Sequence, residues 1–365
     1  IDDHPNIGPA NYDVGHLFHV EGSVYGNAGC IACVCTDGKK AGAYTVHNAP
    51  DSDHFNMIVA HEFGHQFGGY HVQSSSNCRS GNNSEVEPGS GSSIMGYAGI
   101  CPTNVQQEPD DYFNYVDIRD VAIWTINNSN CAEVIPTGNT APVANAGNDY
   151  TIPKSTPFIL EGSAVDGDGT DQLTYCWEQN NPENPLSSAS PQPTWDVGPL
   201  FRSRQPTDTP VRYMPQLEDV IQGNLTPTWE VLPAVSRTMV FELTVRDNAI
   251  AGGQTATDEK IITVDEASGP FMVTSQQTFE RWNVGEEVVI TWDVANTNVS
   301  PVSEANVDIL LSVDGGRTYP HLLVDNTLND GVETLTVPDI AGADAARVMV
   351  LSLIHISEPT RHGLI

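Results

Sequence analysis

The sequence predicts an α+β domain followed by two all-β sandwich modules. Three observations indicate this arrangement: the motif HEFGHQFGGYH at residues 61–71, six of the seven cysteines within the first 131 residues, and short alternating strand patterns after residue 142. A chain of 365 residues has room for two or three domains. We therefore expect a first domain at 1–135, a linker at 136–141, one sandwich at 142–266 and a second at 267–350.

The charge balance excludes several classes of function. The chain carries 47 acidic against 15 basic residues, a formal net charge of −32. Such a field repels phosphate backbones and anionic lipid, so we expect neither a nucleic-acid partner nor a peripheral membrane role. No apolar run approaches the length of a membrane span.

The motif at residues 61–71 has the chemistry of a zinc site. His61 and His65 lie four residues apart, so on a helix both imidazoles leave the same face and can share one metal ion. Gly68 can adopt a positive φ and end the helix, which brings His71 back as a third ligand. Three imidazoles leave a fourth zinc position for water, whose pKa falls to about 7, and Glu62 is placed to take its proton. The alternative is a helix with scattered structural histidines.

A second motif, SIMGY at residues 93–97, follows about two dozen residues later. It resembles the Met-turn of the metzincin zinc peptidases, and the long histidine motif with a Met-turn distinguishes this clan from other zinc peptidases. The resemblance implies a zinc-dependent endopeptidase acting on proteins or peptides. It implies that His61, His65 and His71 bind Zn²⁺, that Glu62 is the general base and later the proton donor, and that Met95 is a hydrophobic floor.

Tyr97 follows Met95 by two residues. Some metzincins carry a tyrosine at this place that ligates zinc or stabilises the oxyanion, so the resemblance assigns Tyr97 a catalytic role; packing in the cleft wall is the alternative. The whole chain resembles bacterial reprolysin-like (adamalysin-like) proteases with C-terminal modules of the PKD type. It departs from adamalysins at Val72, where they typically carry Asp.

Two helices are expected in the first domain. The first begins near Ser52 or Asp53, either of which can cap it, and Val59, Phe63 and Phe67 form its buried stripe. The second covers residues 116–127, with apolar residues at helical spacing: Ile118, Val121, Ala122 and Ile126. Residues 72–92 are polar and rich in Gly and Ser, which predicts a loop at the rim of a cleft.

Residues 1–50 are expected to form strands and loops. The apolar runs at 12–18 and 31–35 predict short strands, and in the resembling family these are the last strands of the catalytic sheet, including the edge along which a substrate peptide can lie. Four further histidines are interpreted as structural, because three ligands already fill the site: His16, His19, His47 and His54.

The cysteines indicate a secreted protein in which disulfides form. The resemblance to reprolysin-like domains implies the pairs Cys78–Cys101 and Cys35–Cys131. Cys30 and Cys33 pair with each other or with cysteines outside this sequence. A cysteine-rich metal cluster is the alternative, but Cys33 and Cys35 are too closely spaced for a standard zinc knuckle. Cys176 has no obvious partner and is expected to be a buried free thiol.

Residues 142–266 resemble a PKD-type, immunoglobulin-like sandwich, in which Trp177 belongs to the core. Asp166, Asp168 and Asp171 can hold Ca²⁺ through clustered oxygens, or form a solvated turn. In the second, immunoglobulin/fibronectin-like module, Val288, Ile290, Trp292 and Val294 alternate with polar residues. Residues 312–319 resemble the Asp-box hairpin of sialidases, which in a single copy marks a stable turn.

Both ends of the sequence suggest a fragment. The chain begins in what looks like the middle of a domain, and residues 351–361 resemble a translated sequencing adapter, so 351–365 are interpreted as an artefactual tail. Two alternatives to a secreted peptidase remain. One is a non-catalytic protein whose sandwiches bind extracellular polymer or protein; the other is an inactive fragment of the protease. The intact Glu62 argues against a degenerate peptidase.

Overall fold

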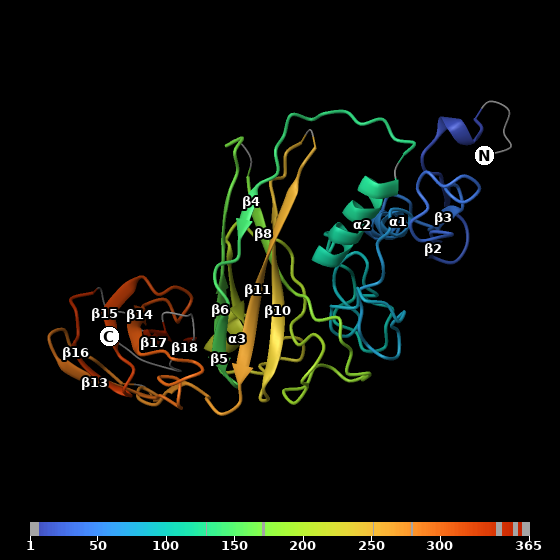
Figure 1. The fold of residues 1–365 in the computed structure, drawn as a ribbon. Helices are drawn as coiled ribbons and strands as arrows, with labels where there is room; N and C mark the ends of the chain where they lie inside the picture. Colours follow the sequence, from blue (N-terminus) through green and yellow to red (C-terminus); the bar gives the residue numbers. More distant parts are fainter. Residues whose placement is uncertain are drawn as a thin grey trace.

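A computed structural model describes residues 7–128, 130–169, 172–250, 252–278, 280–340, 345–352 and 357–359. These residues are mostly β with few helices, and they form three parts that follow one another along the chain (Figure 1). Within the described residues, no helix is both long and apolar enough to cross a bilayer. Asp171 lies outside this set.

The first part contains a small sheet in the order β1-β3-β2, after a single 3₁₀ turn at η1 (Pro9–Asn11). β1 (His16–His19) runs parallel to β3 (Ala43–Val46), and β2 (Tyr25–Asn27) runs antiparallel to it at the other edge. The prediction of a strand at 31–35 is wrong. Ala32 and Cys35 have φ of 59° and 62°, and this left-handed backbone is incompatible with an extended strand.

Helix α1 (Asp53–Gln66) carries the first two histidines of the motif. Ser52 caps its start by accepting a 3.2 Å hydrogen bond from the Phe55 N–H. After its end the chain turns at Gly68, which has φ 110°. The prediction that Phe63 and Phe67 belong to a buried face is wrong, because both are only half-buried. The buried residues of the helix are instead Glu62, Gly64, His65 and Gln66. The two phenylalanines instead line a hollow of about 480 Å³ between α1 and α2.

Helix α2 (Tyr115–Asn128) begins one residue before the predicted start and ends one residue after the predicted end. Its buried residues are Val116 and Asp117 in the first turn. The apolar spacing correctly indicates a helix but not a buried stripe, because Ile126 is 82% exposed and Ile118 and Val121 border the same hollow as Phe63. Figure 1 shows α2 between α1 and the first sandwich.

Residues 72–92 form an irregular loop as predicted, but most of it is buried rather than exposed at a cleft rim. Apart from an exposed tip near residues 76–83, this irregular segment is buried, and Ser90, Ser92 and Ser93 have no exposed surface. Two carboxylates make the burial possible by accepting backbone hydrogen bonds. Glu87 accepts from the N–H groups of Ser92 and Ser93, and Glu85 accepts from the N–H groups in the exposed tip.

The first sandwich consists of a four-stranded sheet, in the order β5-β11-β10-β8, and of shorter strand pairs opposite it. The sheet consists of β5 (Tyr150–Pro153), β11 (Thr255–Asp265), β10 (Arg237–Arg246) and β8 (Thr174–Gln179). The pairs are β4 (Val143–Asn145) with β7 (Ser163–Val165) and β6 (Phe158–Glu161) with β9 (Val211–Met214); α3 (Leu217–Ile221) follows. As predicted, Trp177 is a core residue, 3% exposed, and packs in the same cluster as Phe158 and Phe241.

The second sandwich packs two sheets, β12-β13-β16 and β15-β14-β17-β18. Their bounds are β12 (Met272–Val273), β13 (Glu287–Asp293), β14 (Asn306–Ser312), β15 (His321–Leu328), β16 (Val332–Thr336), β17 (Arg347–Ser352) and β18 (Ser357–Pro359). The predicted alternation on β13 is confirmed, since Val288, Ile290 and Trp292 are all buried. β17 ends at Ser352 and pairs with β18, which lies wholly within residues 351–365, the range interpreted above as an artefactual tail.

After β14 the chain turns through residues 314–316, as the Asp-box pattern suggests. The Asp314 carboxylate accepts hydrogen bonds of 3.0 Å from the N–H groups of both Arg317 and Thr318. The carboxylate therefore stabilises a turn, and its hydrogen bonds account for the motif.

Candidate metal centre

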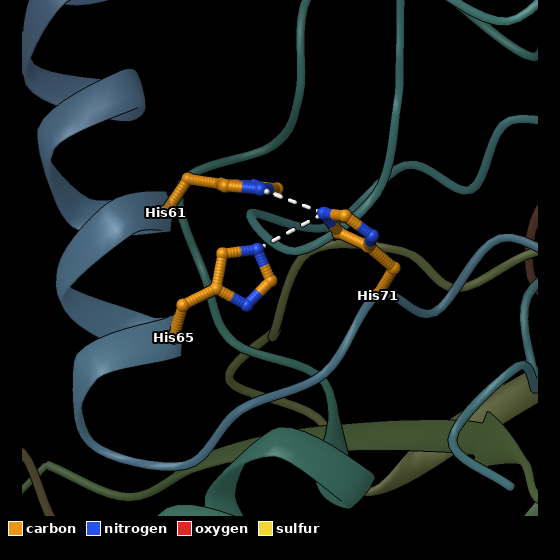
Figure 2. A group of neighbouring side chains, drawn as sticks. All are labelled: His61, His65 and His71. Carbon is orange, nitrogen blue, oxygen red and sulfur yellow. Dashed lines mark hydrogen bonds between the residues drawn. The ribbon is translucent and has the colours of Figure 1, made fainter. Parts of the chain in front are cut away.

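The three motif histidines converge on one point (Figure 2). His61 and His65 project from α1, and His71 reaches them from the chain that turns back after Gly68. The Nε2 atom of His71 lies 3.2 Å from that of His61 and 3.0 Å from that of His65. Within the described residues, this is the only group of three or more His, Cys, Asp or Glu side chains close enough to hold one ion.

The opposite ring nitrogen of each histidine has its own partner. The Nδ1 atoms of His61 and His65 lie 2.8 and 2.9 Å from the carbonyl oxygens of Ile94 and Gly69. A carbonyl can only accept, so both Nδ1 atoms carry the proton and both Nε2 atoms present a lone pair. The Nδ1 atom of His71 lies 2.7 Å from the Ser80 hydroxyl.

Burial keeps these imidazoles neutral. It lowers the pKa of His61 and of His71 to about 3, with the neighbouring motif histidines as the next cause, and it also lowers the pKa of His65. Neutral imidazole is the form that binds metal. The site is therefore ready to accept a cation without first releasing protons.

The residues fit a zinc ion. The Nε2 lone pairs of His61 and His65 both face Nε2 of His71, which when neutral can donate a proton to at most one of them, whereas a cation between the three rings satisfies all three. Tetrahedral zinc with bonds of about 2.05 Å sets its ligand nitrogens about 3.3 Å apart, close to the separations seen here. Partners on the far nitrogen of each ligand are also typical of zinc sites, because they fix the tautomer and the ring orientation.

The partner of His71 is a feature that sequence reasoning missed. Ser80 belongs to the exposed tip of the 72–92 segment, nine residues after its histidine. The fully buried carboxylate of Glu85 holds this tip: it accepts from the N–H of Ser80 at 2.8 Å and forms an ion pair with Arg79 at 2.6 Å. The S-G-N-N-S sequence at residues 80–84 signals only a turn, so no local pattern identifies Ser80.

Glu62 lies on the same helix and is 7% exposed. Burial raises the pKa of its carboxyl to about 7, and a hydrogen bond from the backbone N–H of Ala28 acts in the opposite direction by lowering it. Strand β2 passes directly against this side chain, and a Cβ at Gly26 would collide with the Glu62 carboxylate. No sequence pattern points to Gly26, although its lack of a side chain leaves the space that Glu62 occupies.

Met95 is fully buried beneath the centre. It packs against Gly64, where a Cβ would lie 2.5 Å from the Met95 sulfur, so the second variable position of H-E-x-x-H has to be small here. The carbonyl of the preceding residue, Ile94, is the hydrogen-bond partner of His61. Met95 thus packs against α1 between His61 and His65, while its role as a hydrophobic floor for a metal stays a prediction.

Tyr97 lies at the side of the histidines. Its ring centroid is 4.4 Å from that of His71 and 6.1 Å from that of His61. Burial, followed by the charge of Glu62, raises the pKa of the Tyr97 hydroxyl, which is therefore a neutral hydrogen-bond donor at neutral pH.

The other histidines lie apart from the centre. His16 contacts the Gln66 carboxamide oxygen at 3.1 Å and the Thr45 hydroxyl at 2.8 Å, and it stacks on Phe63. Nδ1 of His54 lies 2.8 Å from the Glu108 carboxylate, and the ring centroid of His54 lies 5.4 Å from that of His47. These contacts are structural, and among the described residues none of the three belongs to a metal-binding group.

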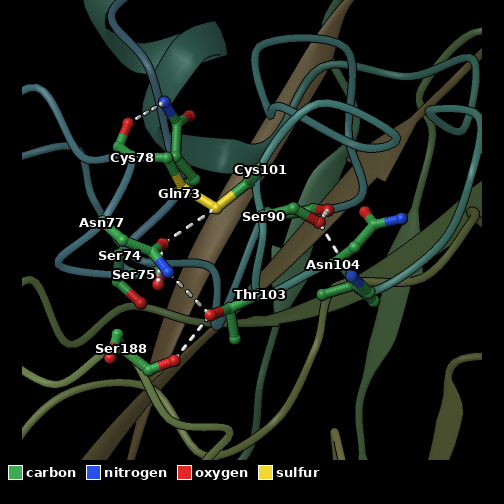
Figure 3. The surroundings of a disulfide bond; sticks show 12 residues. Gln73, Ser74, Ser75, Asn77, Cys78, Ser90, Cys101, Thr103, Asn104 and Ser188 are labelled. Atoms are coloured by element: carbon green, nitrogen blue, oxygen red, sulfur yellow. Dashed lines mark hydrogen bonds between the residues drawn. A yellow bond between two sulfur atoms is a disulfide. The ribbon is translucent and has the colours of Figure 1, made fainter.

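The first part contains three disulfides. The structure pairs Cys78 with Cys101 and Cys35 with Cys131, as the resemblance implies, and it pairs Cys30 with Cys33. Figure 3 shows the Cys78–Cys101 bond joining the segment after His71 to the segment after the Met-turn. Cys176 is free and buried.

Nothing in the structure favours calcium at the predicted aspartates. Asp168 accepts two hydrogen bonds from Thr140, and its own N–H donates to Asp166 at 2.9 Å. Asp171 lies outside the described residues. Asp166 and Asp168 act as turn residues here, and we assign them no metal.

Comparison with known proteins agrees with the geometry of the first part. Residues 3–130 match the model of the family described as "Metallo-peptidase family M12B Reprolysin-like". No curated protein matches the chain. The matched segment contains all three histidines, Glu62, Met95 and Tyr97, and all six bonded cysteines except Cys131.

Solved structures that match the chain are remote. A chimeric titin Z1Z2 carrying a decorin-derived peptide is 11% identical, with a TM-score of 0.20 over 62% of this chain and 97% of its own. The FN1–FN3 domains of chicken CNTN1 are 10% identical, with a TM-score of 0.23 over 62% and 65%. Scores this low carry no argument. The assignment thus rests on the metal centre and the family match: residues 3–130 are similar to the reprolysin-like metallopeptidases.

Proposed function

We propose that this chain is the catalytic part, with two attached sandwiches, of a secreted zinc-dependent endopeptidase. The observation that carries the proposal is the convergence of three neutral imidazoles whose far nitrogens are each held by a hydrogen-bond partner, beside a buried carboxylate. His61, His65 and His71 would hold the zinc. When bound, zinc acts as a Lewis acid and lowers the pKa of water to about 7.

Glu62 is the general base of this proposal. A carboxyl with a pKa of about 7 is balanced between accepting and releasing a proton near neutral pH. It takes a proton from the attacking water and later gives it to the leaving nitrogen of the peptide. Tyr97, neutral and beside His71, supports the developing negative charge on the substrate oxygen by donating a hydrogen bond.

The substrate is an extended peptide that adds to strand β2. Within the described residues β2 is an edge of its sheet, with unpaired backbone groups along one side. Gly26, at the centre of β2, touches Glu62, so a peptide paired with this strand passes the catalytic carboxylate. The scissile bond therefore lies beside residues 26–28.

Casein hydrolysis by the purified chain tests the proposal. We expect Glu62→Gln to lower kcat by about 10²- to 10⁴-fold while bound zinc stays near one ion per chain, because only the general base is lost. Glu133→Gln, a change at an exposed carboxylate outside the site, should match the unaltered chain. Cleavage that survives in Glu62→Gln, or that persists after chelation of zinc, would contradict the proposal.

Secretion is part of the proposal. Disulfides persist in oxidising compartments, and the first part contains three of them. The expected substrates are accordingly extracellular proteins or peptides. Thiol titration of this 365-residue chain, exported to an oxidising compartment, would test the disulfides: one free cysteine is expected after denaturation, and seven would refute them.

A further inference from the structure

The first sandwich contacts the floor of the metal centre. Ser203, 2% exposed, lies between β8 and β9 of the sandwich, and its carbonyl accepts a 2.9 Å hydrogen bond from the Ser92 hydroxyl. Its own hydroxyl accepts from Tyr112, which is 6% exposed. Ser92 directly precedes the Met-turn, and Tyr112 lies just before α2, so one sandwich serine ties together both segments below the zinc ligands.

A second sandwich residue contacts the start of helix α2. Glu178 on β8 is 1% exposed. Its carboxylate accepts a 2.9 Å hydrogen bond from the N–H of Tyr115, the first residue of the helix. Ser203 donates to its other oxygen at 2.6 Å. A carboxyl oxygen at a helix N-terminus satisfies a backbone group that would otherwise be buried without a partner. Asn114, the residue before the helix, accepts from the N–H of Val116 at 3.1 Å, and Glu178 of the sandwich adds the partner of the Tyr115 N–H.

The contacts lead to a zinc ligand in few steps. The Tyr112 carbonyl accepts from the Ile94 N–H at 3.1 Å, and the Ile94 carbonyl in turn accepts from Nδ1 of His61 at 2.8 Å. The path from Ser203 to His61 therefore consists of three consecutive hydrogen-bonded contacts. Every residue on this path except His61 is buried.

The two parts also meet around the Cys78–Cys101 disulfide. The sandwich segment at residues 184–188 offers its backbone there: the Ser187 carbonyl accepts from the Ser76 N–H at 3.0 Å, and the Ser188 carbonyl accepts from the Thr103 hydroxyl at 2.5 Å (Figure 3). Trp229 packs on Gly89, where a Cβ would lie 2.7 Å from its ring. The sandwich thus contacts both segments that the disulfide joins.

We propose that residues 142–266 complete the metal centre rather than form an independent module, with Ser203 and Glu178 as positioning residues for His61. The inference deepens the proposed function, since it names what holds that site in shape. It explains why the segment at 84–96 is buried although it has no regular structure: one of its faces is covered by the sandwich.

Cutting the linker tests this directly. Residues 132–138 are exposed, and all three disulfides lie within residues 30–131, so after a cut no covalent bond joins the parts. We would insert a site for a specific protease at Gly138 of the full chain, cut it, and analyse the product by gel filtration with zinc analysis. The pieces should elute together with zinc bound. Pieces that separate, with zinc retained on the first, would overturn the proposal.

Point variants of the full chain test the positioning residues. Ser203→Ala should weaken zinc binding about tenfold, measured by competition with a chelator, and lower kcat with little change in KM. The matched control is Ser188→Ala, because Ser188 uses only its carbonyl at the same interface. Glu178→Ala should act like Ser203→Ala, and Glu178→Gln, whose amide oxygen can still accept from Tyr115, should restore most of the affinity.

The readouts separate this inference from the proposed function. Zinc affinity and co-elution need no peptidase activity, so a chain that binds zinc but cleaves nothing defeats the proposed function alone. Zinc affinity in Ser203→Ala equal to that in Ser188→Ala, with hydrogen exchange of β10 and β11 unchanged, would refute the positioning role. If Ser203→Ala disturbs that exchange, the comparison of Glu178→Gln with Glu178→Ala decides.

Discussion

The metal-bearing part and the sandwiches are held together by different means. In the sandwiches a single apolar cluster runs from Phe158 and Phe241 in the first module to Trp292 in the second. The metal-bearing part has a small apolar cluster around Met95 and Val116, while three disulfides and the buried carboxylates of Glu85 and Glu87 cross-link its irregular backbone. Apolar burial suffices where strands alternate; an irregular catalytic region needs covalent and polar links instead.

This difference makes the two parts sensitive to different changes. A cavity should damage the sandwiches, whereas loss of a disulfide or a carboxylate contact should damage the metal-bearing part. Hydrogen exchange followed by mass spectrometry resolves the two regions in one experiment, so each change can be assigned to the part that it weakens.

The largest effect should come from a cavity in the sandwich. Phe241 on β10 is fully buried against Phe158 and Phe201, so Phe241→Ala should lower the free energy of unfolding by about 3–5 kcal/mol. Urea denaturation measures the loss, and Thr238→Ala, at an exposed position on the same strand, serves as the control. A loss below about 1 kcal/mol would contradict a sandwich stabilised mainly by its apolar core.

Opening the Cys78–Cys101 bond should cost about 3 kcal/mol, because it closes a loop with a sequence separation of 23. In the double variant Cys78→Ser, Cys101→Ser we expect faster hydrogen exchange in residues 72–101 and unchanged exchange in β10. The double variant Cys30→Ser, Cys33→Ser, with a separation of only 3, should cost less. Equal losses in both pairs would contradict this account.

Stability should fall as pH rises. Burial raises the pKa of Glu178 to about 7 in the folded chain, whereas the unfolded value is about 4.5. Between pH 4.5 and pH 7 the folded chain keeps the proton on Glu178, whereas the unfolded chain releases it. The stabilisation from this proton is therefore complete below about pH 4.5 and is lost as pH rises through about 7. These values correspond to a loss of about 2–3 kcal/mol between pH 5 and pH 7.5.

Glu178→Gln should reduce this pH dependence, since an amide does not titrate. It should not remove it, because burial also raises the pKa of Glu242 to about 7 and raises the pKa of Asp117 well above its usual range. Denaturation curves of both proteins at several pH values make the measurement. A variant with the same pH dependence as the unaltered chain would show that Glu178 is already ionised when folded.

The smallest effect should come from Ser80. Ser80→Ala removes the partner of Nδ1 on His71 and should weaken zinc binding about tenfold, or about 1.4 kcal/mol. Ser76→Ala, an exposed serine of the same segment, should leave zinc binding unchanged. Chelator competition measures both. An unchanged affinity in Ser80→Ala would show that the His71 ring needs no partner on its far side.

The sequence by itself determined the spacing of the three histidines, the helix that carries two of them and the alternation of one strand. The spacing of His61, His65 and His71 on a capped helix that ends at Gly68 is a local matter of helical period and backbone freedom. The alternation on β13 likewise follows from strand geometry alone. Such features can be recognised because the residues that decide them are neighbours in the chain.

Tertiary structure decided what surrounds those residues. Three features depend on residues distant in sequence: the oxygen that faces each far nitrogen, the burial of an irregular polar segment, and the partner of the Tyr115 N–H. Ile94 lies 33 positions from His61, and Glu178 lies 63 positions from Tyr115. A serine or a glutamate carries no local signal of such a partner. Its role appears only when folding brings the two segments together and leaves their polar groups no access to water.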